Sequence, residues 1–123
     1  MSKPKILEMQ GTVLYEDETG TNGAVTFSEE ITEGEIEIVY CRRKTDGSSI
    51  YKATGKIPFI EGMEIDLDIN YFSNPDNQQS ISKSITINNN GITVNGENTW
   101  GNTNGFNNAT STIYIVKVKK YIY

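Results

Sequence analysis

A polar stretch at residues 95–108 holds the only tryptophan of the chain. It reads NGENTWGNTNGFNN, which places two aromatic side chains among asparagines and glycines. An indole ring can stack on a sugar ring or another flat ligand with polar edges, while neighbouring amides donate and accept hydrogen bonds. The candidate ligand-binding residues are therefore Trp100, Asn102, Asn104, Phe106 and Asn107.

A structural role for the same aromatic residues is the alternative. Residues 95–110 carry no strand pattern, so the sequence predicts a long loop there. Trp100 and Phe106 would then fold inward and cover one end of the domain, because burying a ring of this size stabilises by roughly 2–3 kcal/mol. We expect an ordered loop with at least one ring buried and some asparagine amides left outward.

Catalytic chemistry has few candidate residues in this sequence. The absence of histidine excludes Ser-His and Cys-His nucleophilic pairs and any histidine metal site. Glu61, Glu64, Asp66 and Asp68 remain as conceivable paired carboxylates. The last three alternate along one predicted strand, which is typical of a solvated strand face. The sequence thus predicts no enzyme, no catalytic residue, no metal site and no cofactor.

The single cysteine, Cys41, excludes an intramolecular disulfide. It lies in an alternating run, so we interpret it as a small hydrophobic strand residue rather than a reactive thiol.

The elements that must position these residues are strands. Apolar side chains recur at every second position in many short runs, most clearly at 35–38 and 64–71. Such runs are found at 11–15, 24–27, 36–41, 49–54, 64–71, 80–87, 91–94 and 112–118. The pattern predicts an all-β fold: one domain, residues 1–123, forming an antiparallel, jelly-roll-like two-sheet β-sandwich of about eight short strands.

Turn signals between the runs predict how the strands connect. Asparagine, aspartate and glycine cluster at 21–23, 45–47, 73–76, 88–91 and 95–96. We expect adjacent strands to form hairpins, most clearly 80–88 with 91–95. The final strand is apolar on both faces at first and then one-sided, and its lysines predict that it emerges toward a sheet edge.

Charge and hydropathy limit the partners. A net charge of -5 and a pI near 4.7 argue against nucleic acid as a partner. No apolar run approaches the roughly 20 residues that span a bilayer, so no membrane insertion is expected. The N-terminal residues lack the apolar segment of a signal peptide, which predicts synthesis in a bacterial cytoplasm.

Two parts of the chain carry a family resemblance. They are GTVLYED through NGAVTF to EIEIVY at 11–40, and ITVNG through TIYIVKV at 92–118. Together they resemble small β-modules of tail and baseplate proteins of phages and prophages of low-GC Gram-positive bacteria. The departure is Lys119-Lys120, where a more apolar or glycine-containing end is expected.

The resemblance implies a noncatalytic, virion-associated structural protein of the tail or baseplate, with a contribution to host-surface attachment as a further expectation. It also implies a homo-oligomer, with a trimer favoured, or assembly with a larger tail protein, and it makes a host cell-surface glycan a candidate partner. The alternative function is a carbohydrate-binding module that uses the Trp100 stretch.

Overall fold

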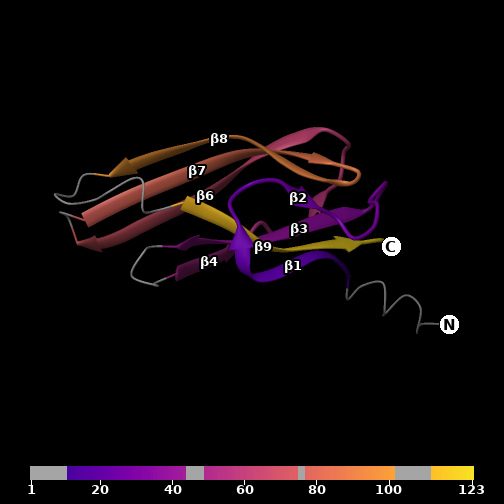
Figure 1. The fold of residues 1–123 in the computed structure, drawn as a ribbon, viewed down its shortest axis with the longest axis horizontal. Helices are drawn as coiled ribbons and strands as arrows, with labels where there is room; N and C mark the ends of the chain where they lie inside the picture. The colour runs from indigo at the N-terminus through magenta and orange to yellow at the C-terminus, as the bar shows by residue number, and fades with distance from the viewer. Residues whose placement is uncertain (1–10, 44–48, 75–76, 102–111) are drawn as a thin grey trace.

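Two antiparallel β-sheets packed face to face form the protein (Figure 1). The computed structural model describes residues 11–43, 49–74, 77–101 and 112–123. These ranges contain nine strands and no helix, and hence no helix that is long and apolar enough to cross a membrane. The predicted all-β sandwich is confirmed, with one more strand than expected.

The strands divide between the sheets as follows. Sheet A contains, in spatial order, β1 (Thr12–Thr21), β9 (Thr112–Tyr121), β3 (Glu35–Arg43) and β4 (Ser49–Ala53), with β5 (Ile57–Pro58) also paired to β3. Sheet B contains β2 (Val25–Thr26), β8 (Gly91–Gly101), β7 (Asn77–Asn88) and β6 (Met63–Asn74). The strand that the sequence pattern missed is β5, which is only two residues long.

Strand pairing brings an early strand beside a late strand in both sheets. β1 pairs with β9 in sheet A, and β2 pairs with β8 in sheet B. Wrapped pairing of this kind is typical of a jelly roll, whereas β6, β7 and β8 follow one another as a meander. The expected hairpins are confirmed for β3–β4, β6–β7 and β7–β8. The expectation is wrong for β1 and β2, which belong to different sheets.

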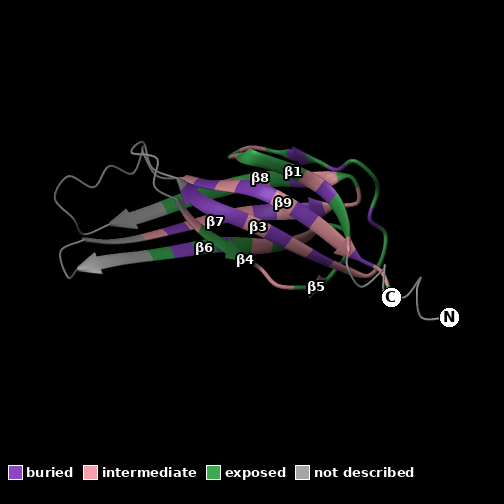
Figure 2. Ribbon diagram, turned by 90° about the horizontal axis from the view of Figure 1, so that it is seen from below, coloured by how far each residue is buried: buried purple, intermediate pink, exposed green. Residues whose placement is uncertain are grey.

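The core lies between the sheets and follows the period-two pattern, so buried and exposed positions alternate along the strands (Figure 2). Ile81, Ile85 and Ile87 of β7 are fully buried, and they belong to one cluster with Ile36 and Ile38 of β3. The two sheets are also joined by a polar contact. The buried Tyr40 hydroxyl of β3 donates to the Asp68 carbonyl oxygen of β6 at 3.1 Å.

The last strand does not emerge toward an edge, so that prediction is wrong. β9 lies between β1 and β3 from Ile115 to Lys120, and Lys120 is opposite Thr12 on one side and Ile36 on the other. Two of its lysines pair with acids: the Lys117 ammonium lies 3.4 Å from a Glu16 carboxylate oxygen, and Lys120 lies 3.1 Å from Glu29. Opposite charges on neighbouring segments therefore permit lysines in a central strand.

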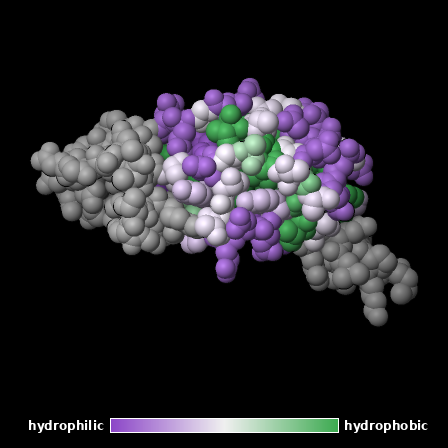
Figure 3. Space-filling model, in the orientation of Figure 1, coloured by the Kyte–Doolittle hydropathy of each residue, from purple (hydrophilic) through white to green (hydrophobic). Residues whose placement is uncertain are grey.

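Two predictions about single strands are confirmed. Glu64, Asp66 and Asp68 are all exposed on β6, and Cys41 is buried on β3. Hydrophilic side chains cover much of the described surface in the orientation of Figure 3, with smaller apolar areas between them.

Candidate functional site

A polar groove on the outer face of sheet B is the candidate binding site. Its volume is about 410 Å³. Three neighbouring strands, β6, β7 and β8, supply the residues that line it, namely Asp66, Ser82, Ser84, Asn95, Gly96, Glu97 and Asn98. Hydroxyl, amide and carboxylate groups together can both donate and accept hydrogen bonds. The groove is thus suited to a ligand rich in hydroxyl groups.

A β-bulge shapes this groove. Ser84 is opposite Gly96, but the next residue of β7, Ile85, is opposite Val94, so Asn95 is an extra residue in β8. The prediction of a turn at Asn95-Gly96 is therefore wrong. Turn-forming residues also suit bulges, and the neighbouring strand continues to pair beyond this point. The bulge moves Asn95 out of the regular ladder, next to the groove.

Side-chain hydrogen bonds hold Asn95 in place. Its amide nitrogen donates to the Thr86 hydroxyl at 2.9 Å and to a Glu64 carboxylate oxygen at 3.3 Å. These contacts cross all three strands that line the groove. They fix the amide before any ligand arrives, which lowers the entropic cost of binding.

An ion pair with a buried ammonium joins the same segment of β8 to β7. Lys83 of β7 is only 2% exposed, and its ammonium lies 3.6 Å from a carboxylate oxygen of Glu97, the residue opposite it. The ammonium also donates to the Asn22 carbonyl oxygen. Burial lowers the pKa of Lys83 below its ordinary value, and the Glu97 carboxylate opposes this shift.

Glu97 in turn connects sheet B to the start of β9. One carboxylate oxygen accepts from the Thr112 hydroxyl at 2.6 Å, and the other accepts from the Ile113 backbone N–H at 3.0 Å. Glu97 therefore connects the bulged segment of β8 to β7 and β9, and both Glu97 and its neighbour Asn98 line the groove.

The residues predicted from sequence lie at or beyond one end of β8. Residues 95–101 belong to this strand and not to a loop, so that part of the loop prediction is wrong. Backbone pairing with β7 continues through this polar segment because strand hydrogen bonds do not need apolar side chains. Trp100 is opposite Ser80, two residues along β8 from Asn98, and its side chain is not among those described. Asn102, Asn104, Phe106 and Asn107 lie outside the described residues.

Three residues that line the groove are not predicted as binding residues from the sequence. The sequence pattern identifies Ser82 and Ser84 only as polar positions of a strand, and Asp66 as part of a solvated face. The available signal is the polar register of β7, in which Ser80, Ser82 and Ser84 alternate with buried residues. A row of hydroxyls on one face of a strand becomes a site only when neighbouring strands add amides and carboxylates beside it.

The part of the chain that the structure describes contains no candidate metal-binding site. No three histidine, cysteine, aspartate or glutamate side chains there are grouped so that they could hold a metal ion.

Comparison with known proteins yields no relative. No family model matches the chain, and no curated protein or solved structure matches it either.

Proposed function

We propose that this protein is a noncatalytic tail or baseplate component of a phage or prophage that contributes to host attachment through the outer face of sheet B. The observation that carries the binding part of this proposal is the groove between β6, β7 and β8, with its hydroxyls, amides and carboxylates. The tail context is supported by the sequence resemblance at 11–40 and 92–118. The ligand class that fits the groove is a glycan of the host cell surface.

The position of Trp100 favours a glycan over other polar ligands. Trp100 lies on the same strand as Asn95 and Asn98 and is opposite Ser80 of β7, so its backbone adjoins the groove. Aromatic rings bind the apolar faces of sugars, while amides and hydroxyls bind their edges. Within the tail, the protein would assemble as a homo-oligomer, with a trimer favoured, or on a larger tail protein.

Replacing groove residues should weaken glycan binding without unfolding the protein. We expect Asn98→Ala and Ser84→Ala each to lower affinity about fivefold, since one neutral hydrogen bond is worth about 1 kcal/mol. The measurement is binding to an array of Gram-positive cell-wall glycans, followed by calorimetry on any glycan retained. Thr93→Ala is the control, because Thr93 is exposed on β8 and does not line the groove. Equal losses in all three variants would contradict the assignment.

Tryptophan fluorescence provides a second, independent test. Trp100 is the only tryptophan, so a glycan that binds beside it should change the emission in a saturable way, with Kd between about 1 µM and 1 mM. Trp100→Ala should then lose affinity for that glycan. A glycan that binds and leaves the emission unchanged would remove Trp100 from the site.

A free carbohydrate-binding module is the second candidate function, favoured by the same groove. The two functions differ in assembly. Native mass spectrometry of the tail protein should give an oligomer, whereas a strict monomer at high concentration together with glycan binding would favour the free module.

A further inference from the structure

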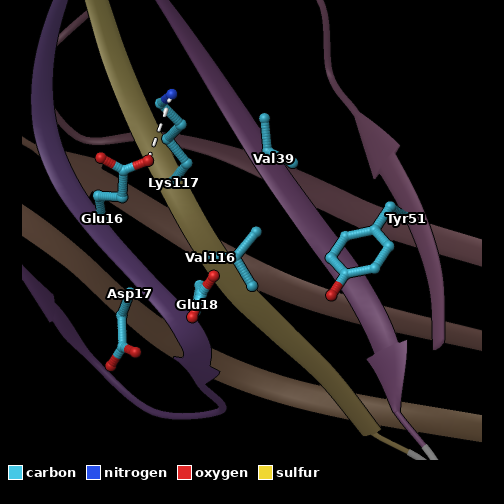
Figure 4. Close-up of a pocket in the computed structure, with 7 residues that line it drawn as sticks. All are labelled: Glu16, Asp17, Glu18, Val39, Tyr51, Val116 and Lys117. Atoms are coloured by element: carbon cyan, nitrogen blue, oxygen red, sulfur yellow. Dashed lines mark ion pairs between the residues drawn. The ribbon is translucent and has the colours of Figure 1, made fainter. Parts of the chain in front are cut away.

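A second depression lies on the opposite side of the molecule, on the outer face of sheet A (Figure 4). It has a volume of about 210 Å³ and is lined by residues of β1, β3, β4 and β9, namely Glu16, Asp17, Glu18, Val39, Tyr51, Val116 and Lys117. It shares no lining residue with the groove of sheet B.

Irregular pairing on both sides of β9 produces this depression. Val39 and Tyr40 of β3 are opposite Lys117 and Ile115, so Val116 is an extra residue in β9. On the other side, Glu16 is opposite Lys117 and the next pair joins Thr21 to Ile115, which leaves residues 17–20 of β1 out of register. Bulges of this kind redirect side chains and are frequent at functional sites.

The contour of β1 at this point depends on Gly20. Its φ is +78°, and a Cβ there would lie 2.9 Å from the Val116 side chain and 3.1 Å from the Ile115 carbonyl oxygen. The backbone of β1 thus passes close over β9 and forms one wall of the depression.

The floor and the opposite wall are apolar. Val39 and Val116 form the floor, and the Tyr51 ring extends from β4 over β3 toward Val116 (Figure 4). Tyr51 is 59% exposed, whereas the neighbouring Val116 is buried. Tyrosine is enriched at the energetically dominant positions of protein interfaces because it offers a large rigid surface and a polar tip.

The charges around the floor indicate which kind of side chain can bind there. The lining contains three acidic residues, Glu16, Asp17 and Glu18, and one basic residue, Lys117, whose ammonium already lies 3.4 Å from Glu16 (Figure 4). The lining therefore has an excess of negative charge. A basic side chain fits such a site, because its aliphatic part can cover the valines while its cation lies against the tyrosine ring and the acids.

We propose that this depression is a docking site for an arginine or lysine side chain of a partner protein. An arginine fits best, because its planar guanidinium can stack on Tyr51 and bind a carboxylate at the same time. The site is independent of the proposed glycan groove, so either assignment can fail without the other. The molecule would then bind a protein with sheet A and a surface ligand with sheet B.

The test uses the 123-residue protein and two five-residue peptides, Gly-Leu-Arg-Leu-Gly and its glutamine counterpart Gly-Leu-Gln-Leu-Gly, both with blocked ends. We expect the arginine peptide to shift the methyl NMR signals of Val39 and Val116 in a saturable way. The glutamine peptide should bind at least about tenfold more weakly, and added salt should weaken the arginine peptide because part of the attraction is electrostatic.

Variants decide whether the binding occurs at this site. Tyr51→Ala and Glu18→Gln should each weaken the arginine peptide about fivefold or more. Tyr123→Ala is the matched control, since Tyr123 is also highly exposed, at 61%, and lies outside the depression. Equal binding of both peptides, equal loss in the Tyr123 control, or no saturable shift up to about 10 mM peptide would each overturn the proposal. Self-association that Tyr51→Ala abolishes would also overturn it, because the occupant would then be a second copy of the chain.

Discussion

Replacing Gly34 by alanine is expected to lower the free energy of unfolding by at least about 3 kcal/mol, because two unfavourable effects combine at this position. Gly34 has a φ of +89°, a backbone conformation that alanine rarely adopts. A Cβ there would also lie 2.1 Å from the Tyr121 carbonyl oxygen, which belongs to the backbone at the end of β9. Neither strand can move away easily, since β3 and β9 are paired from Glu35 and Tyr121 onward.

The matched control is Gly55→Ala. Gly55 has a similar φ of +74°, but nothing lies within 4 Å of the position that a Cβ would take there, so only the conformational cost of about 1–2 kcal/mol should remain. Urea denaturation of both variants, monitored by circular dichroism, measures the difference. If the two variants lost equal stability, the close approach of Gly34 to β9 would have no energetic weight.

The strands themselves were predictable from sequence because burial follows a period of two. Glu35-Ile36-Glu37-Ile38 shows the alternation, and the structure buries Ile36 and Ile38 on β3. Strand order was not predictable to the same degree. The lysines of β9 indicated an edge, but the acids that pair with them, Glu16 and Glu29, come from residues far away in sequence.

The candidate site was predictable only in its general region. Asn95-Gly96 has the chemistry of a turn and of a bulge, and only the partner strand distinguishes them. Since β7 continues opposite β8 as far as Gly101, the segment forms a bulge and the strand extends. Groove residues such as Asp66 and Ser84 come from other strands, so their proximity to Asn95 depends on tertiary register.

The burial of Lys83 was predictable from the sequence. Lys83 occupies the same strand parity as Ile81 and Ile85, both fully buried, so alternation alone places it inward. Its ion-pair partner was not predictable, because Glu97 lies opposite it only after the bulge at Asn95 has shifted the register of β8.

Removing Glu97 is the second change with a large expected effect. Glu97→Ala should cost about 3 kcal/mol, near the lower end of the range for breaking a buried ion pair, since the Glu97 side chain is 24% exposed. The Lys83 ammonium would stay buried with the Asn22 carbonyl oxygen as its described partner, and the Ile113 N–H would lose its acceptor. Thermal and urea unfolding measure the loss.

The reverse change should be much milder. Lys83→Met removes the buried charge and fills the same space with an apolar side chain, so we expect stability within about 1 kcal/mol of the parent. Glu97 keeps two hydrogen-bond donors, the Thr112 hydroxyl and the Ile113 N–H. The double variant should therefore be more stable than Glu97→Ala alone. If it were less stable, the cost of Glu97→Ala would come from lost packing or capping and not from an uncompensated charge.

The same pair gives a pH dependence whose sign follows from the burial of Lys83. Because burial lowers its folded-state pKa from the ordinary 10.5, the unfolded chain binds more protons between these two values, and stability due to Lys83 rises with pH there. Below this window the full cost of the buried ammonium is present. Above about pH 10 the tyrosines have the opposite effect, and stability falls as pH rises. Burial and the hydrogen bond to Glu37 raise the pKa of Tyr121 to about 12.

A comparison with Lys83→Met separates the two effects, because the tyrosines are common to both proteins. The unfolding free energy of Lys83→Met minus that of the parent should fall as pH rises toward 10.5, since only the parent loses a charge penalty on the way. Urea unfolding at several pH values measures this difference. A difference that stayed constant would mean that Lys83 keeps its ordinary pKa in the folded protein, and its ammonium would then be better solvated or better paired than 2% exposure implies.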